Sequence, residues 1–116
     1  MKFPYQSKCF SEARSALMLP FYDGEDGAIA NAFHLCSRAL GEFRLDRSKL
    51  AEEAKVLGWI RVVEETMDTD GLVDPAGIGA WRVKARSLTV DEKSAFSTAV
   101  AELAAWFDMQ FWSGAQ

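Results

Sequence analysis

The chain has 116 residues, of which 49% are hydrophobic and 26% are charged, as in an ordinary globular domain with enough apolar material for one core. Its formal net charge of −4 argues against nonspecific binding to nucleic acids and to anionic membranes, because both depend on an excess of Lys and Arg. We therefore expect a single domain over residues 1–116, with neither nucleic acid nor a membrane as its partner.

The first ten residues, MKFPYQSKCF, lack the apolar core of a signal peptide, and no apolar run approaches the ~18 residues of a membrane span. The expected compartment is therefore cytoplasmic. Cys9 and Cys36 lie far apart and form no CxxC motif. In a reducing compartment we expect them to be buried free thiols rather than a disulfide.

The first helix is predicted over about residues 7–19, where Phe10 and Ala13 share one side. Pro20 ends it, because the residue before a proline is pushed out of the helical region. Residues 21–27 then form a turn rich in Gly and acidic residues. The acidic side chains suit the positive N-terminal end of a second helix.

The second helix is predicted over about residues 25–43, because apolar residues recur there at steps of four, three, four and three. His34, the only histidine, falls opposite this apolar arc and should be exposed. Its neighbours one turn away, Asn31 and Arg38, offer no carboxylate to orient an imidazole for acid–base catalysis. The members of the arc are Ile29, Phe33, Cys36, Leu40 and Phe43.

A three-residue connection leads to a third helix, which has Asp46 as its cap and continues to about residue 67. Its apolar positions drift around the helix, so Trp59 and Val62 fall toward the outer side. The short connection would suit a helix-turn-helix motif. However, residues 48–67 carry three basic and four acidic side chains, which is the wrong balance for a helix that meets phosphates.

Residues 68–79, DTDGLVDPAGIG, are predicted to be the one substantial loop. The three Asp residues align with ligand positions of a calcium-binding loop, but Thr66 stands at the first position and Gly77 replaces the bidentate Glu. We therefore interpret the segment as an Asp-rich turn. Neither a metal nor a cofactor is expected.

The pattern of residues 80–88 is compatible with a helix and with a strand. Apolar and basic residues alternate as in a strand, yet Trp81, Ala85 and Leu88 have helical spacing. We favour a short helix, with an edge strand paired to residues near Leu72 as the alternative. The basic side chains here are expected to pair with the acidic loop that precedes them. These are Arg82, Lys84 and Arg86 on one side and Asp68, Asp70 and Asp74 on the other.

The last helix, from Thr89 to about Trp112, has the strongest periodic pattern in the chain. Thr89 and Glu92 fit a capping box, in which each side chain accepts a hydrogen bond from the other residue's N–H. On the side opposite the apolar stripe lie Met109 and Trp112. The stripe, predicted to anchor the core, comprises Phe96, Val100, Leu103, Phe107 and Phe111.

The predicted fold is therefore all-α, a small bundle of four main helices with a short extra helix or two-stranded ribbon around residues 72–88. With no catalytic constellation in view, we expect a non-enzymatic interaction module whose partner is a second copy (a homodimer) or another protein. The expected interface consists of outward apolar side chains, a kind enriched at interface cores. These are Trp59, Val62, Met109 and Trp112.

The alternative is a small-ligand-binding protein or an enzyme with a pocket between the C-terminal helix and the 68–79 loop. Trp81 and Trp106 are the aromatic side chains expected to line such a pocket.

Overall fold

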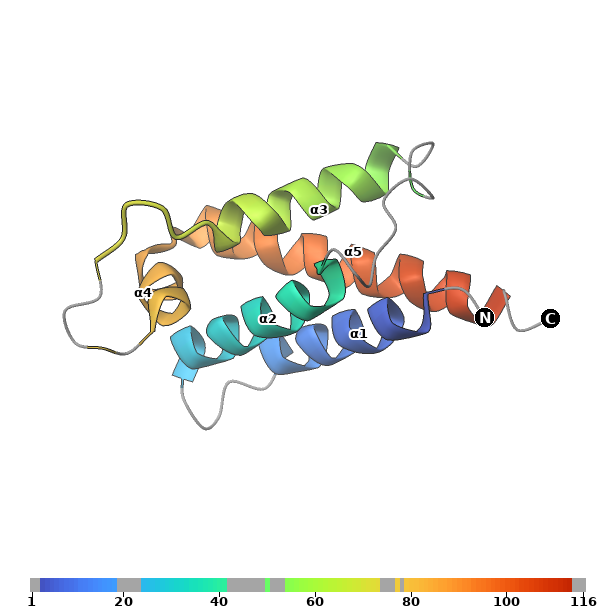
Figure 1. Cartoon of the computed structure of the whole chain (residues 1–116), viewed down its shortest axis with the longest axis horizontal. Helices are drawn as coiled ribbons and strands as arrows, with labels where there is room; N and C mark the ends of the chain where they lie inside the picture. Colours follow the sequence, from blue (N-terminus) through green and yellow to red (C-terminus); the bar gives the residue numbers. More distant parts are fainter. Residues whose placement is uncertain are drawn as a thin grey trace.

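The computed structural model describes residues 3–18, 24–41, 50, 54–73, 77 and 79–113. Within these ranges the chain forms five α-helices and no β-strand, which confirms the predicted all-α class (Figure 1). The helices are α1 (Pro4–Met18), α2 (Gly24–Leu40), α3 (Ala54–Met67), α4 (Ala80–Ser87) and α5 (Val90–Ser113).

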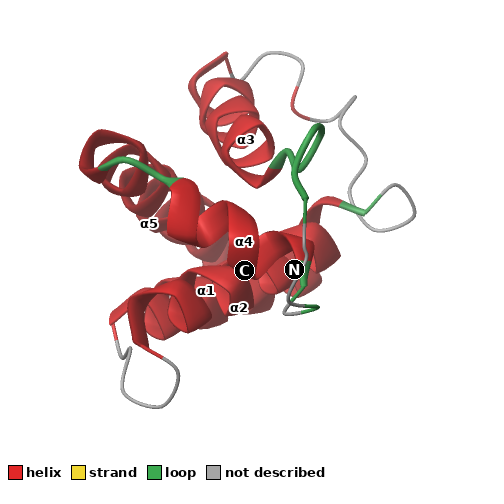
Figure 2. Cartoon of the chain, turned by 90° about the vertical axis from the view of Figure 1, so that its left-hand side faces the viewer, coloured by secondary structure: helices red, strands yellow, loops and turns green. Residues whose placement is uncertain are grey.

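The helix α5 is the central element of the bundle. It has 24 residues and runs along the long axis of a molecule that measures 49 × 29 × 26 Å (Figure 1). The helix α1 packs against both α2 and α5, whereas α3 packs against α5 and α4 against α2. Figure 2 shows the consequence: α3 lies on one side of α5 and the α1–α2 pair on the other.

The core is built from phenylalanine pairs that join helices. Phe10 of α1 stacks on Phe107 of α5, with ring centroids 5.4 Å apart, and Phe33 of α2 meets Phe96 of α5 edge to face at 5.0 Å. All four rings are fully buried. The predicted stripe on α5 is therefore confirmed, except that Phe111, in the last turn, is half-buried.

The first helix begins three residues earlier than predicted, at Pro4. Proline is favourable at the first helical position, where a backbone N–H would have no partner within the helix. Two polar side chains in the first turns of α1, Gln6 and Ser7, are buried. Gln6 Nε2 donates to the Ala39 carbonyl oxygen at 3.2 Å, near the end of α2, and Ser7 Oγ donates to Asp108 of α5 at 3.3 Å.

The helix α3 covers α5 with a wider face than its sequence pattern suggested. Val56, Ile60 and Val63 are buried, while Trp59 and Val62 are half-buried and pack against the same core. The prediction that Trp59 and Val62 point outward is therefore wrong, because both pack against the core at the edge of a broad apolar arc. The predicted cap, Asp46, lies outside the described residues.

Residues 80–88, for which the sequence left a helix and a strand open, are mainly helical. The helix α4 covers Ala80–Ser87, and the strand alternative is wrong. Ala85 and Leu88 are buried and Trp81 packs against the core, so the helical spacing of the apolar residues determined the outcome. Among the described residues, no helix combines the length and apolarity that a membrane crossing requires.

The capping box at the start of α5 is confirmed. The Thr89 N–H donates to Glu92 Oε1 at 3.0 Å, and the Glu92 N–H donates to Thr89 Oγ1 at 3.1 Å. Hydrogen bonds to the Glu92 carboxylate, first from the Thr89 backbone N–H and then from the Thr89 side chain, lower the pKa of this carboxyl. The cap fixes the residue at which α5 starts, directly after α4 and its buried neighbour Leu88.

Candidate functional site

The most distinctive surface feature is an apolar strip on α5. Met109 and Trp112 are 58% and 63% exposed, although both are large and hydrophobic. Ala105 is exposed and Ala101 is half-exposed. The four residues follow one another at steps of four, four and three, so they share the side of α5 that faces away from its buried stripe. We refer to Ala101, Ala105, Met109 and Trp112 as the α5 strip.

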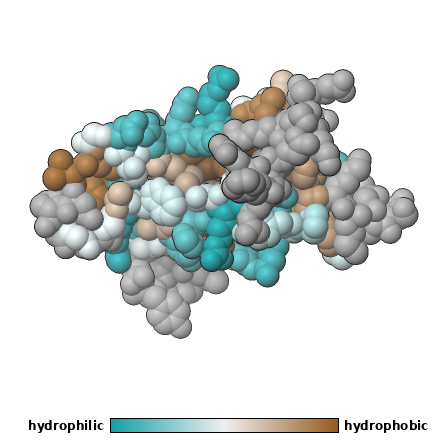
Figure 3. All heavy atoms as spheres, viewed as in Figure 1, coloured by the Kyte–Doolittle hydropathy of each residue, from teal (hydrophilic) through white to brown (hydrophobic). Residues whose placement is uncertain are grey.

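The surroundings of the α5 strip are polar or acidic. Glu102 and Asp108 flank it and are exposed, and the chain has no basic residue after Lys93. On the face shown in Figure 3, the visible hydrophobic residues lie in separate groups, and hydrophilic residues cover the outer edge of α3. Single exposed hydrophobic side chains are common on protein surfaces, whereas the α5 strip places four apolar residues in one row.

Of the four interface residues predicted from sequence, the structure brings two together. Met109 and Trp112 lie one turn apart on the outer side of α5, whereas Trp59 and Val62 belong to the edge of the core under α3. The sequence reasoning missed Ala101 and Ala105. Their spacing from Met109 is visible in the sequence, but alanine is too weakly hydrophobic to define an apolar strip by itself.

A pocket of about 610 Å³ lies where the ends of α2 and α3 meet the start of α4. None of the described residues that line it is basic, and three carry carboxylates. Trp81 forms an aromatic wall, and its ring also meets that of the exposed His34 edge to face, with centroids 6.0 Å apart. The described lining consists of Ser37, Leu40, Gly41, Glu64, Glu65, Met67, Asp68 and Trp81.

This pocket differs from the one predicted. It borders α2, α3 and α4 rather than α5, and Asp68 is the one described residue of the 68–79 loop that contributes to it. Trp106 lies elsewhere, because Phe3, just before α1, covers its ring at a centroid distance of 6.0 Å, and Phe107 meets it at 5.0 Å. Most lining residues of the pocket come from helix ends that only the tertiary fold brings together, so no sequence spacing could have revealed them.

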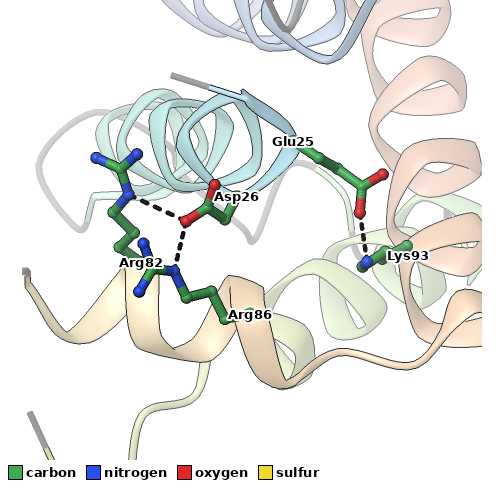
Figure 4. Close-up of polar contacts among 5 residues, drawn as sticks. All are labelled: Glu25, Asp26, Arg82, Arg86 and Lys93. Atoms are coloured by element: carbon green, nitrogen blue, oxygen red, sulfur yellow. Dashed lines mark hydrogen bonds and ion pairs between the residues drawn. The ribbon is translucent and has the colours of Figure 1, made fainter.

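The start of α2 is linked by ion pairs to α4 and α5 (Figure 4). Oδ2 of Asp26 accepts from Nε of Arg82 at 3.1 Å and from Nε of Arg86 at 2.6 Å, while Glu25 pairs with Lys93 of α5. The hydrogen bonds from Arg86 and then Arg82 lower the pKa of Asp26 to about 2.

The partner that the structure shows for both arginines of α4 is Asp26 of α2, which the sequence did not indicate. Arg82 and Arg86 are one turn apart, on the side of α4 that faces α2, and both therefore reach Asp26. In the 68–79 loop, Asp68 accepts from the Asp70 N–H at 3.0 Å, which is the Asx turn expected of an Asp-rich segment. Asp74 lies outside the described residues.

The two cysteines are buried free thiols, as predicted. Burial, together with the neighbouring Cys9, raises the pKa of the Cys36 thiol to about 12, which makes it unreactive at neutral pH. Within the described part of the chain, no three His, Cys, Asp or Glu side chains gather in a way that could hold a metal ion.

Comparison with known proteins identifies no relative: no family model, no curated protein and no solved structure matches the chain.

Proposed function

We propose that this protein is a non-enzymatic cytoplasmic interaction module that associates with a second copy of itself through the α5 strip. The observation that carries the proposal is the exposure of Met109 and Trp112 in one row with Ala105 and Ala101. Trp and Met are enriched at the cores of protein interfaces, and small residues allow two helices to approach closely.

The order of small and large side chains along the α5 strip favours a two-fold symmetric pairing in which the α5 helices of two copies run antiparallel. When two α5 helices cross antiparallel near position 107, Ala105 of one copy lies opposite Met109 of the other, and Ala101 lies opposite Trp112. Each large side chain then meets a small one. A contact formed by one strip from each copy is smaller than a standard stable interface, so the expected association is weak and reversible.

Matched methionine substitutions test where the contact lies. Met109→Ser removes a member of the strip, whereas Met18→Ser removes a methionine of similar exposure, 67%, at the end of α1. Light scattering at micromolar concentration should show association of the wild type and of Met18→Ser. It should show an increase of about tenfold or more in the dissociation constant for Met109→Ser and for Trp112→Ser.

Unfolding of the dissociated monomer provides the control. Trp112→Ser should leave it nearly unchanged, because the side chain is mostly exposed. Equal association of all variants would contradict the proposal. Strong destabilisation of the Trp112→Ser monomer would show that Trp112 belongs to the core.

A second candidate function, a small-ligand-binding protein or an enzyme, is favoured by the Trp81 pocket. An aromatic wall beside Glu65 and Asp68, with no basic residue in the described lining, suits a small organic cation. Titration with tetramethylammonium, followed through the Trp81 indole resonance, tests this candidate. A saturable shift that Glu65→Gln weakens would support it, and an unchanged resonance at millimolar concentration would reject it.

A further inference from the structure

The helices α1 and α2 lie side by side and antiparallel (Figure 1), and a hydrogen bond marks their register. Gln6 Nε2, near the start of α1, donates to the carbonyl oxygen of Ala39, near the end of α2, at 3.2 Å. In an antiparallel pair, each step forward along α1 is matched by a step backward along α2. Cys9 stands three residues after Gln6, and Cys36 stands three residues before Ala39. The two cysteines therefore occupy the same level of the helix pair.

Both cysteines also belong to a line of buried residues on the side of their helix that faces the other helix. Each line has steps of three and four, so its members share one side. The residues that contact α5 are different ones, namely Ser7 and Phe10 of α1 and Phe33 of α2. The two lines form what we call the α1–α2 seam, which consists of Gln6, Cys9 and Ala13 on α1 and Ala39, Cys36 and Ala32 on α2, all of them buried.

Small side chains bring the two cysteines of the α1–α2 seam within bonding range. Ala13 and Ala32 meet at the level next to theirs, and alanine lets two helix axes approach to about 8 Å. Since Cα atoms lie about 2.3 Å from a helix axis, directly opposed Cα atoms are then within about 6 Å of each other. A disulfide spans Cα atoms about 4.4–6.8 Å apart. Burial and, after it, the nearby Cys9 raise the pKa of the Cys36 thiol, and the second of these effects requires the two sulfur atoms to be close.

We propose that Cys9 and Cys36 form a reversible disulfide between α1 and α2 when a peroxide oxidises them, and that they are free thiols under reducing conditions. The structure shows the reduced state. The disulfide fixes α1 on α2 and shortens the unfolded chain by a cross-link, so it stabilises the folded bundle. Neither cysteine belongs to the α5 strip, and the proposal is therefore independent of self-association.

The oxidation begins at Cys9, because its side chain is 4% exposed and that of Cys36 is 0% exposed. The Cys9 sulfur attacks one oxygen of hydrogen peroxide, the O–O bond breaks, and the leaving hydroxide takes the Cys9 proton to become water. The Cys36 sulfur then attacks the sulfur of the Cys9 sulfenic acid. The S–S bond forms as the S–O bond breaks, and the second hydroxide leaves as water with the Cys36 proton. Two thiols are thus oxidised while one peroxide is reduced to two waters.

Mass spectrometry of the full chain after treatment with equimolar hydrogen peroxide tests the proposal. The main product should be a single chain that has lost two hydrogen atoms. In denaturant it should take up N-ethylmaleimide only after reduction with dithiothreitol, and its digest should contain a peptide pair joined through Cys9 and Cys36. The proposal is overturned if both thiols stay free, if Cys9 is oxidised without a bridge, or if the bridge joins two chains.

A matched control moves one thiol by a single residue. Lys8→Cys combined with Cys9→Ala keeps two thiols, but Lys8 is exposed and lies about 100° around α1 from Cys9. This variant, with its helix content checked by circular dichroism, should give about tenfold less of the bridged single chain, because its thiols do not oppose each other. Equal bridging of the variant and the wild type would show that the register of α1 and α2 does not select the pair.

Thermal unfolding tests whether the disulfide fits the folded bundle without moving it. The oxidised wild type should unfold at a temperature about 5–15 °C higher than the reduced protein, and dithiothreitol should remove the difference. Cys36→Ala, treated with peroxide in the same way, should show no rise. A bridged protein that unfolds at a lower temperature than the reduced one would mean that α1 and α2 must shift to form the bond, which overturns the proposal.

Discussion

Asp26 shows how a single side chain connects distant parts of this sequence, because it holds two arginines that lie 56 and 60 residues further along the chain. Its folded-state pKa of about 2 lies below the ordinary value of 3.8. A depressed carboxyl pKa contributes stability above the ordinary pKa, and that contribution is lost as the pH falls through the folded value. The contribution of Asp26 is therefore complete above about pH 4 and disappears between about pH 4 and pH 2.

The first prediction is that the carboxyl carbon of Asp26, followed by NMR, titrates with a midpoint near 2. Replacing Arg82 and Arg86 by Gln should move the midpoint toward 3.8, since the guanidinium groups cause the shift. A wild-type midpoint already at 3.8 would mean that the two ion pairs do not form in solution.

Phe107 carries the second prediction at this scale. It is fully buried, stacks on Phe10 and meets Phe3 and Trp106 edge to face. Phe107→Ala should lower the free energy of unfolding by about 3–5 kcal/mol, because it leaves a cavity among several rings. Phe111→Ala, at a half-buried position one turn later, should cost less. A loss below about 1 kcal/mol for Phe107→Ala in a denaturant titration would show that this side of α5 does not face the core.

Among the helices, the capping box at the start of α5 makes Thr89 contribute more to the free energy of unfolding than an ordinary surface threonine does. Thr89→Ala should destabilise the protein by about 0.5–2 kcal/mol, as the loss of an N-cap does. Thr98→Ala makes the same change at an exposed position inside α5, where alanine favours the helix, and should not destabilise it. Equal effects of the two substitutions in thermal unfolding would mean that the cap contributes nothing.

Local signals predicted most of these elements. The capping box, the exposed side of His34 and the apolar periodicity of α5 and of α2 as far as Leu40 depend on residues within a few turns of one another, and the structure confirms them. The second helix ends at Leu40 rather than at the predicted Phe43, and Phe43 lies outside the described residues. The start of α1 at Pro4 does not follow from apolar periodicity, because a proline at the first helical position is favoured by its missing N–H and not by a hydrophobic pattern. The segment of α4 was ambiguous because alternating Arg and Lys residues imitate a strand.

The contacts between elements could not be predicted from local signals. Nothing near Asp26 in the sequence indicates Arg82 or Arg86, and the loop aspartates were closer candidates. The Trp81 pocket likewise depends on how α2, α3 and α4 meet. Met109 and Trp112 were identified correctly as outward residues because the phase of one helix determines their direction, whereas Trp59 was misplaced because its helix has a drifting apolar face.

In the molecule as a whole, charge acts in opposite directions on self-association through the α5 strip and on the contact between α4 and α2. The chain carries a net charge of −4, and Glu102 and Asp108 flank the α5 strip, so two copies repel each other and added salt should strengthen their association. The contact between α4 and α2 is an attraction of opposite charges, which salt weakens. Raising the NaCl concentration should therefore promote self-association while loosening α4.

Self-association of this helical protein through the α5 strip is tested most directly by sedimentation equilibrium of the wild-type chain at low and high salt. We expect a molar mass that rises from one chain, 12.9 kDa, toward two chains with increasing concentration, and that rises at lower concentration when salt is added. A mass of one chain at every concentration and salt level would contradict it.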